Sequence, residues 1–479
     1  MKIYINHKYD TEILELARVL FSEEIVVTSN VEIKDECELW YLIEDDAFLL
    51  YENQQIIGAS KLQNYSFPEF LDQKSQFKFA LKKAFCQGVE KINGRKPYWG
   101  ILTGVRPVKM VHKMFDLSYK KEDIIAVLTQ VFLLKENNAI LIVDIAESER
   151  RYFPESNESY SLYISIPFCP SKCTYCSFPT HVYKKWAHKE DEYMDKLIQE
   201  ISAIAEVLKD KLLDTIYVGG GTPTSITAKN MDKLLAHLQA VFNESNIREF
   251  TYEAGRPDTI DLEKLQILKK YGVTRISINP QTMDDNILKN MGRSHSVADI
   301  KSCYKDSRAM GFDSINMDLI VGLPGDTVDG FHETLNQIEQ LNPENITVHT
   351  LAIKRASALK DIKDQFSYPS EADMQRMVDY SKTFLASKGY HPYYIYKQQN
   401  MLGNFENIGY AKDGKEGIYN ILMMEEVQNI IAVGVGGVSK IHEFGTGRFD
   451  NIPNVRDIVE YLERYEEMIV RKLDHLADR

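Results

Sequence analysis

The chain has 479 residues, with 44% hydrophobic and 27% charged residues and a formal net charge of −13. This length exceeds that of one ordinary domain, so we expect a globular protein of two or three domains. The acidic charge argues against nucleic acid as the main partner. The N-terminus has no basic-then-apolar leader pattern, and no apolar run approaches the ~20 residues of a membrane helix. These features predict a cytoplasmic protein without a membrane span.

Residues 1–153 differ in pattern from the rest of the chain and predict an N-terminal α+β accessory domain. Short runs such as "KIYIN" and "ELWYLIEDDAFLL" read as strands separated by turns. From "DQKSQFKFALKKAF" onward, apolar residues recur at spacings of three and four, which is typical of helices. The polar stretch "PESNES" then marks the best candidate for a domain boundary.

Residues 160–365 contain six short apolar runs separated by helical stretches. The runs are residues 161–166, 215–220, 249–254, 274–279, 314–322 and 345–351. Strands that alternate with helices predict an α/β fold with a parallel sheet, either an open wound sheet or a partial (β/α)6 barrel. Right-handed crossovers place the C-terminal ends of all strands on one face, where barrel enzymes build their sites.

The fifth apolar run carries a carboxylate on a face that we expect to point inward. Asn316, Asp318 and Ile320 share this face because side chains alternate along a strand. A carboxylate inside a barrel is unfavourable unless it is paired or bound. Asp318 is therefore either a ligand-binding residue or a structural carboxylate satisfied by local hydrogen bonds.

Residues 366–479 mix strand-like and helical patterns and predict a smaller C-terminal α+β element packed on the barrel. They include the tyrosine-rich "GYHPYYIYKQQ" and the glycine-rich "AVGVGGVSK". An amphipathic helix, "VRDIVEYLERYEEMIVRKL", follows near the end.

Three of the six cysteines cluster directly after the first apolar run, with the spacing C-x3-C-x2-C. They are Cys169, Cys173 and Cys176. Zinc is one candidate ligand, with His181 as a fourth donor, but the spacing differs from that of paired zinc knuckles. An iron–sulfur cluster held by thiolates fits better, and three thiolates leave one iron of a four-iron cluster open.

The other cysteines are isolated in apolar or mixed contexts. We expect Cys37, Cys86 and Cys303 to be small buried hydrophobic residues.

Several sequence words around these cysteines resemble those of a known family. "YISIPFCPSKCTYCSF" followed by "GGGTPT" resembles the radical S-adenosylmethionine superfamily. "RISINPQT" and "MDLIVGLPG" are similar to the oxygen-independent coproporphyrinogen III oxidases and their heme-chaperone relatives. "WGILTGVRPVK" and "GKEGIYNILMMEE" look most like the HemZ-type coproporphyrinogen dehydrogenases. The resemblance to the family core covers roughly residues 160–460.

The resemblance implies a [4Fe-4S] cluster and S-adenosylmethionine as cofactors, and it implies a role for each matching residue. Cys169, Cys173 and Cys176 would ligate the cluster. Glu253 would face the cofactor ammonium, Gln281 and Asp318 its ribose, and Arg293 its carboxylate. Tyr175 would shield the cluster, and Tyr163, the first predicted catalytic residue, would lie near the cluster. The remaining matches are the cofactor-contacting glycines Gly219, Gly220 and Gly221.

The reaction implied by the resemblance is the oxidative decarboxylation of two propionates of coproporphyrinogen III to vinyl groups. It would give protoporphyrinogen IX without oxygen, with an electron donor such as flavodoxin or ferredoxin. A heme-binding chaperone and a radical heme-degrading methyltransferase are the alternatives on this scaffold. The chain departs from the oxidase pattern at Ser165, where that pattern has His, and at Ser177–Phe178, where it has a further Cys.

A tetrapyrrole with several carboxylates needs local cations in an acidic protein, because long-range repulsion is screened beyond ~8 Å. Arg355 is the first candidate and the second predicted catalytic residue, since its guanidinium matches a carboxylate with two parallel hydrogen bonds. The other candidates are Lys354, Lys397 and Lys440.

Overall fold

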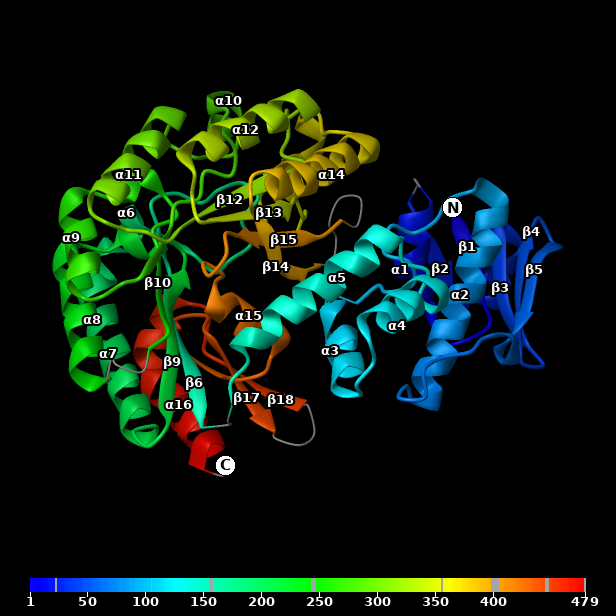
Figure 1. Cartoon of the computed structure of the whole chain (residues 1–479), viewed down its shortest axis with the longest axis horizontal. Helices are drawn as coiled ribbons and strands as arrows, with labels where there is room; N and C mark the ends of the chain where they lie inside the picture. The colour runs from blue at the N-terminus through cyan, green and yellow to red at the C-terminus, as the bar shows by residue number, and fades with distance from the viewer. Residues whose placement is uncertain are drawn as a thin grey trace. The chain divides into compact units, whose positions relative to one another are not determined.

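The computed structural model describes residues 1–21, 24–104, 106–155, 158–242, 247–354, 356–397, 405–443 and 448–477. The chain divides into two compact units, Met1–Glu147 and Ser148–Arg479. The first unit contains a five-stranded sheet and the second an eleven-stranded sheet. Figure 1 shows the elements of the two units along the chain.

The sheet of the first unit has the strand order β2-β1-β3-β4-β5. Strand β1 runs parallel to both of its neighbours, β2 and β3, and β3, β4 and β5 form antiparallel hairpins. Both hairpin turns, Asp45–Asp46 and Asn53–Gln54, have positive φ at their two residues, as two-residue hairpins of this hand require. The strands are β1 (Lys2–Ile5), β2 (Val26–Thr28), β3 (Leu39–Glu44), β4 (Ala47–Glu52) and β5 (Gln55–Lys61).

Helices make up the rest of the first unit. The long helix α2 begins after Asp72, whose carboxylate accepts a hydrogen bond from the Ser75 amide (2.6 Å), and ends at Gly94 in the left-handed conformation. The predicted α+β character of the N-terminal region is confirmed. The helices are α1 (Asp10–Leu20), α2 (Gln73–Asn93), α3 (Val108–Asp116), α4 (Lys121–Ala126) and α5 (Glu136–Glu149), the last of which continues to the start of the second unit.

Six consecutive parallel strands form the centre of the second unit, in the order β6-β9-β10-β11-β12-β13. They coincide with the six predicted runs, and the partial (β/α)6 barrel is confirmed. The strands are β6 (Ser159–Ile166), β9 (Leu212–Gly220), β10 (Glu249–Glu253), β11 (Arg275–Ser277), β12 (Ile315–Val321) and β13 (Asn345–Thr350).

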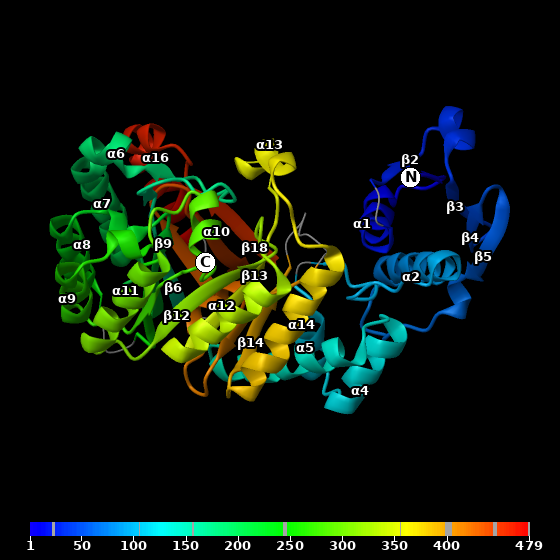
Figure 2. The ribbon, with the colours of Figure 1, turned by 90° about the horizontal axis from the view of Figure 1, so that it is seen from above.

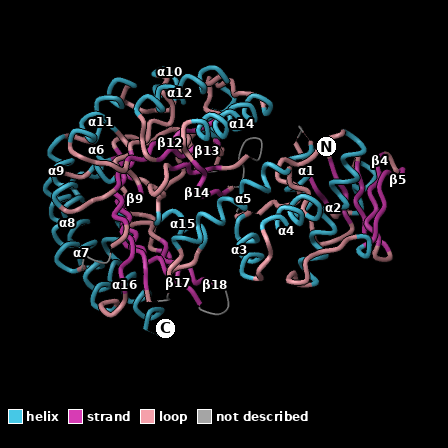
Figure 3. Tube along the Cα trace, in the orientation of Figure 1, coloured by secondary structure: helices cyan, strands magenta, loops and turns pink. Residues whose placement is uncertain are grey.

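Amphipathic helices cover the outer side of these strands (Figure 2 and Figure 3). Helix α8 illustrates why they form: Thr227 caps its N-terminus, and its buried residues Met231, Leu234 and Leu238 recur at spacings of three and four. The helices are α7 (Glu190–Val207), α8 (Ala228–Val241), α9 (Leu262–Lys270), α10 (Asp285–Asn290), α11 (Val297–Ala309), α12 (Val328–Leu341) and α14 (Glu371–Ser387).

The C-terminal strands extend the barrel sheet at both edges. Strands β15 and β14 add to β13 in antiparallel fashion, whereas β16 pairs in parallel with β6 and leads into the hairpin β17–β18. The predicted C-terminal α+β additions are confirmed, but the sequence did not predict that they would join both edges of one sheet. The elements are β14 (His391–Tyr396), β15 (Asn407–Ala411), α15 (Ile418–Glu425), β16 (Asn429–Val433), β17 (Val438–Glu443), β18 (Arg448–Pro453) and α16 (Ile458–Ala477).

The predicted alternation along β12 is confirmed. Met317 and Leu319 are fully buried and belong to the core. Asn316, Asp318 and Ile320 point the other way and line a cavity at the interior of the barrel. None of the helices in the part of the chain that the structure describes combines the length and the apolar character needed to cross a membrane.

A buried ion pair connects α7 to α16. Glu200 accepts a short hydrogen bond from Lys472, and both side chains are almost completely excluded from solvent. The same carboxylate accepts hydrogen bonds from the amide of Gly434 (2.8 Å), the hydroxyl of Tyr461 (2.6 Å) and the side-chain amide of Asn454 (2.9 Å). The last helix therefore fixes the glycine-rich segment after β16 through one carboxylate.

Replacing Lys472 by Met should lower the free energy of unfolding by about 3–5 kcal/mol, because the Glu200 charge would stay buried without its cation. The measurement is urea unfolding followed by circular dichroism. The matched control is Lys209→Met, which removes a lysine whose side chain is 62% exposed and should change stability by at most ~0.5 kcal/mol. Equal unfolding midpoints for the two variants would contradict a stabilising role of the pair.

Candidate functional site

A cavity of ≈ 410 Å³ opens at the C-terminal ends of the barrel strands. Most of the residues that sequence analysis selected lie on its wall although they come from five different strands or the loops that follow them. These are Tyr163, Cys169, Cys173, Tyr175, Cys176, Gly220, Gly221, Glu253, Gln281, Arg293 and Asp318. Gly219 does not line the cavity, and Arg355 lies outside the described residues.

Hydrogen bonds from the backbone and from one side chain hold the cysteine loop at several points. The amide of Thr174 donates to the carbonyl of Met291 (3.1 Å), and the carbonyl of Thr174 accepts from the amide of Leu359 (2.8 Å). The hydroxyl of Ser171 donates to the carbonyl of Gly292 (3.0 Å). These bonds fix the loop before any ligand binds, which limits the reorganisation that ligand binding requires.

All three clustered cysteines are reduced and reach the same cavity. Burial raises the pKa of Cys169 to about 11, and a contact with the Thr222 hydroxyl (3.4 Å) only partly offsets this effect. Burial also raises the pKa of Cys176. Both side chains are therefore neutral thiols at pH 7 unless a bound cation stabilises their thiolates, as iron does. This donor set fits an iron–sulfur cluster.

The alternative fourth ligand, His181, is occupied elsewhere. Its Nε2 atom accepts a hydrogen bond from the amide of Ile458 (3.3 Å), and the residue does not line the cavity. The isolated cysteines Cys37, Cys86 and Cys303 are buried, as predicted. Among the described residues, the cavity thus holds the three clustered thiols without the fourth zinc ligand that the sequence suggested.

Each of the three glycines at the end of β9 makes room for a different part of the site. A Cβ atom on Gly219 would lie 3.1 Å from the Glu253 carboxyl carbon. Gly220 has a φ of +112°, which other residues rarely adopt. A Cβ atom on Gly221 would lie 2.6 Å from the Phe168 carbonyl oxygen and 3.0 Å from the Cys169 sulfur. The glycines are therefore needed for the close packing of the protein itself.

Glu253 ends β10 and lies beside a stack of tyrosines. Tyr217 donates its hydroxyl hydrogen to the Glu253 carboxylate (2.5 Å). The ring of Tyr217 stacks on those of Tyr419 (centroids 4.5 Å apart) and Tyr163 (6.0 Å). Burial raises the pKa of Glu253 to about 7, although the hydrogen bond from Tyr217 opposes the shift. This carboxyl group is therefore poised between its neutral and charged forms near neutral pH.

The pKa of Asp318 shifts in the opposite direction to that of Glu253. Burial alone would raise the pKa of Asp318, but the neighbouring His349 (3.8 Å) and a hydrogen bond from Asn316 (2.8 Å) lower it below its usual value. Gln281 lies next to Asp318 and has a φ of +70°. The backbone amide of Gln281 donates to the backbone carbonyl of Asp318 (2.9 Å). The two side chains thus present a charged acceptor and an amide to the same part of the cavity.

Arg293 and Tyr175 form a connected pair on the cavity wall. The Nη1 atom of Arg293 donates to the Tyr175 hydroxyl (2.8 Å), and Nη2 donates to the carbonyls of Asn279 (2.5 Å) and Gly255 (3.1 Å). Its Nε atom donates to Nε2 of His295 (3.3 Å). An arginine has five N–H groups. Within the described residues, these contacts account for four, and they leave one Nη1 hydrogen for a ligand.

The structure places three of the four candidate cations for a carboxylate-bearing substrate. Lys354 lines the cavity and lies near Cys176, and burial lowers its pKa. Lys440 pairs with Glu426 (3.0 Å), and neither Lys440 nor the buried Lys397 lines the cavity. The sequence does not distinguish these lysines because it does not record how their segments pack.

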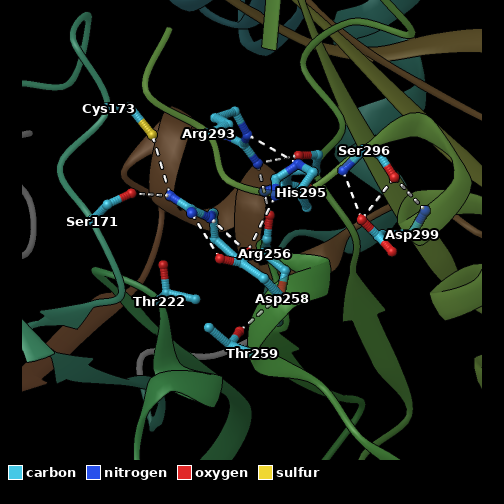
Figure 4. Close-up of polar contacts among 12 residues, drawn as sticks. Ser171, Cys173, Thr222, Arg256, Asp258, Thr259, Arg293, His295, Ser296 and Asp299 are labelled. Carbon is cyan, nitrogen blue, oxygen red and sulfur yellow. Dashed lines mark hydrogen bonds and ion pairs between the residues drawn. The ribbon is translucent and has the colours of Figure 1, made fainter. Parts of the chain in front are cut away.

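Several polar residues of the site were not selected from the sequence. His349 lines the cavity together with Thr347, and the alternation argument applied to β12 would have found both on β13. Tyr217 precedes the glycines on the inward face of β9. Arg256, three residues after Glu253, is almost fully buried beside the cysteine loop, and Figure 4 shows its contacts. The pattern that could have identified Arg256 in the sequence is a basic residue shortly after the end of a barrel strand.

The two departures from the oxidase pattern have distinct surroundings. The hydroxyl of Ser165 donates to the carbonyl of Val435 (2.6 Å) and so joins β6 to the glycine-rich segment after β16. Ser177 and Phe178 line the cavity, and the Phe178 side chain is 63% exposed. The first difference thus supports the scaffold, whereas the second changes the cavity entrance.

Comparison with known proteins agrees with this geometry. Residues 163–338 match the Radical SAM superfamily. The chain is 39% identical to the "oxygen-independent coproporphyrinogen-III oxidase-like protein HemZ" of Bacillus subtilis, over 92% of this chain and 93% of that protein. It is 31% identical to the "heme chaperone HemW" of the same organism, over 65% and 76%. The solved structure of Escherichia coli coproporphyrinogen III oxidase (HemN) has the same fold, with a TM-score of 0.52, 22% identity and coverage of 68% and 73%.

The raised pKa of Glu253 predicts a pH-dependent stability. An unfolded Glu ionises near pH 4.5 and the folded one near 7. The folded state thus binds the extra proton between these values, and its stability advantage is complete below the lower pKa and lost as pH rises through the upper one. From pH 5 to pH 8, the free energy of unfolding of the wild type should fall by roughly 1–3 kcal/mol relative to Glu253→Gln.

Urea unfolding at both pH values measures this difference, and the exposed Glu206→Gln serves as the control. Parallel pH profiles of the wild type and Glu253→Gln would show that the carboxyl group has an ordinary pKa.

Proposed function

The chain belongs to the radical S-adenosylmethionine superfamily and, within it, to the family of oxygen-independent coproporphyrinogen III oxidase-like proteins, and we propose that it is an enzyme that oxidatively decarboxylates propionates of coproporphyrinogen III. The products would be vinyl groups and carbon dioxide, formed without oxygen. For each propionate, one hydrogen atom would pass to S-adenosylmethionine, and a one-electron acceptor outside the chain would take the remaining electron. This superfamily uses a [4Fe-4S] cluster and S-adenosylmethionine.

One observation carries the proposal: three clustered thiols, a partly neutral glutamate and an ionised aspartate converge in a single cavity at the end of the barrel. Thiols supply cluster ligands, and carboxylates supply acceptors for the ammonium and hydroxyl groups of a nucleoside-containing cofactor. The cavity is therefore equipped for both groups that the superfamily uses.

Cys169, Cys173 and Cys176 would hold three irons of the cluster, which leaves the fourth iron for the cofactor. When bound, the cluster and S-adenosylmethionine supply the one-electron chemistry with which the superfamily abstracts hydrogen from its substrates. An external donor such as a flavodoxin or ferredoxin would deliver the electron. The glycine turn holds the cysteine loop against β9 through hydrogen bonds from the amides of Gly221 and Thr222 (2.8 and 2.7 Å).

The cavity side chains would orient the cofactor. Glu253 would ionise as it accepts hydrogen bonds from the cofactor ammonium, because a nearby cation favours the charged form. Asp318 and Gln281 would bind the ribose hydroxyls. The remaining Nη1 hydrogen of Arg293 would reach the carboxylate, and its bond to Tyr175 would keep that ring over the cluster side of the cavity.

Aromatic side chains would form the binding surface for the tetrapyrrole. Tyr163 lines the cavity as part of the stack with Tyr217, and the rings of Tyr394 and Tyr396 lie nearly parallel (6°) on another wall. Flat phenol rings suit a flat macrocycle. Lys354, and Arg355 as predicted from the sequence, would offset the propionate charges.

A heme-binding chaperone is the second candidate function. The match to HemW over about two thirds of the chain favours it, as does the exposed Phe178 in place of a cysteine at the cavity entrance. Such a protein would use the same aromatic walls to hold heme without changing it. The two functions differ in the fate of the tetrapyrrole and not in the cluster.

The cluster assignment predicts a brown protein with about four irons per chain after anaerobic purification, because thiolate-held iron–sulfur centres absorb broadly in the visible range. Iron analysis and absorbance before and after dithionite reduction measure this. Cys169→Ala, Cys173→Ala and Cys176→Ala should each lose most of the iron.

The controls are the buried cysteines elsewhere in the chain. Cys37→Ala, Cys86→Ala and Cys303→Ala should keep the full iron content. A colourless protein with a single bound zinc would rule out the cluster.

The reaction is tested by anaerobic incubation of the reconstituted protein with coproporphyrinogen III, S-adenosylmethionine and a reductant. Release of carbon dioxide and formation of vinyl groups, identified by mass spectrometry, are expected of the decarboxylase. Cys173→Ala provides the inactive control. Stoichiometric binding of intact heme with no conversion of coproporphyrinogen would favour the chaperone, and an opened tetrapyrrole would favour the heme-degrading methyltransferase.

A further inference from the structure

Arg256 is held rigidly beside the cysteine loop. Its side chain is only 4% exposed, and its Nε and Nη2 atoms donate to the two carboxylate oxygens of Asp258, each at 2.9 Å. This paired contact fixes the plane of the guanidinium, and it leaves the Nη1 end to point away from Asp258.

The Nη1 end of Arg256 points at a cluster ligand. It donates to the sulfur of Cys173 (3.7 Å) and to the hydroxyl of Ser171 (3.1 Å) in the same loop, as Figure 4 shows. An ion pair with a purely structural purpose needs only the contact between Arg256 and Asp258. The additional contact places a positive group against the sulfur.

His295 contacts Asp258 and so helps to hold the carboxylate that binds Arg256. It is buried, and its Nε2 atom accepts from Nε of Arg293 (3.3 Å). Burial lowers the pKa of His295, so the ring is neutral at pH 7 and its Nδ1 hydrogen is available to Asp258 (3.2 Å). Burial disfavours the charged form of Asp258, but His295 and Arg256 outweigh this and hold its pKa well below the usual range. The partner of Arg256 therefore stays ionised.

Hydrogen bonds to the sulfurs are one of the means by which proteins set the potential of an iron–sulfur cluster. Reduction adds negative charge to the cluster, and an N–H donor with a positive charge stabilises that added charge. The ion pair of Arg256 and Asp258 is neutral in sum, but its positive end is the nearer one to Cys173. Its field thus favours the reduced state.

We infer that Arg256 is a positioning residue that donates a charge-assisted hydrogen bond to the Cys173 thiolate and thereby raises the reduction potential of the cluster, with Asp258 and His295 fixing its orientation. This inference rests on the proposed cluster, and it makes the potential depend on residues that do not ligate iron. Thr222 gives Cys169 a weaker, uncharged partner, so the ligands differ in their surroundings.

The test is a redox titration of the cluster, followed by electron paramagnetic resonance, in the absence of S-adenosylmethionine and substrate. Arg256→Lys keeps the positive charge but cannot bind Asp258 and reach the sulfur together. The pair Arg256→Met with Asp258→Asn removes both charges without leaving Asp258 unpaired. Both variants should have a lower midpoint potential than the wild type, and the loss should be larger for the pair.

The matched control is Arg308→Met with Glu344→Gln, which removes another partly buried arginine–carboxylate pair (2.7 Å) outside the cavity. Its potential should equal that of the wild type. Iron content is measured first in every protein. A wild type without iron would overturn the proposed function and this inference together. An Arg256 variant with a full cluster and an unchanged potential would overturn the inference alone.

A second measurement needs no substitution. In wild-type protein grown with ¹⁵N-labelled arginine, pulsed resonance of the reduced cluster should detect coupling to a guanidinium nitrogen. If the variants fail to hold a cluster, the nitrogen coupling in the wild-type protein tests the inference by itself. Absence of this coupling would show that Arg256 does not bond to a ligand sulfur.

Discussion

The close approach of the turn after β9 to the cysteine loop is the constraint on which the site depends. Gly221 has no room for a side chain because the loop backbone and the Cys169 sulfur lie against it. Gly219 leaves the corresponding space to Glu253 on the next strand. A side chain at either position would therefore separate the thiols from the carboxylate. The barrel supplies the framework, but this contact determines that the clustered thiols and the Glu253 carboxylate share one cavity.

The cavity also contains two carboxyl groups whose pKa values shift in opposite directions because their surroundings differ. Glu253 lies among tyrosine rings, and its pKa rises to about 7, whereas Asp318 has polar neighbours and its pKa falls. Two identical functional groups thus reach opposite protonation preferences within one barrel, a device that enzymes use to divide roles between acids. A cationic ligand at Glu253 would change its charge on binding, but the same ligand would leave the charge of Asp318 as it was.

The barrel and the position of the cavity followed from local rules in the sequence, whereas the family resemblance supplied several of the individual wall residues, such as Tyr175 and Arg293. Strand–helix alternation placed the C-terminal strand ends on one face, and alternation along β12 placed Asp318 inside. Contacts between distant segments could not be predicted in this way. The sequence gives no sign that β16 pairs with β6, that Lys440 is occupied by Glu426, or that Arg256 turns toward Cys173. Each depends on how two elements pack, which no pattern within either element records.

The pairing of β6 with β16 has a consequence for synthesis on the ribosome. The strand that leads into the cysteine loop gains its second neighbour only from a segment about 270 residues later, as the bond between Ser165 and Val435 illustrates. Until that segment emerges, one edge of β6 offers unpaired backbone groups, which are prone to wrong association. The thiols at its end are then already exposed to oxidants. The nascent barrel is therefore the stage at which an unpaired strand edge and free thiols occur together, and at which protection against wrong association matters most.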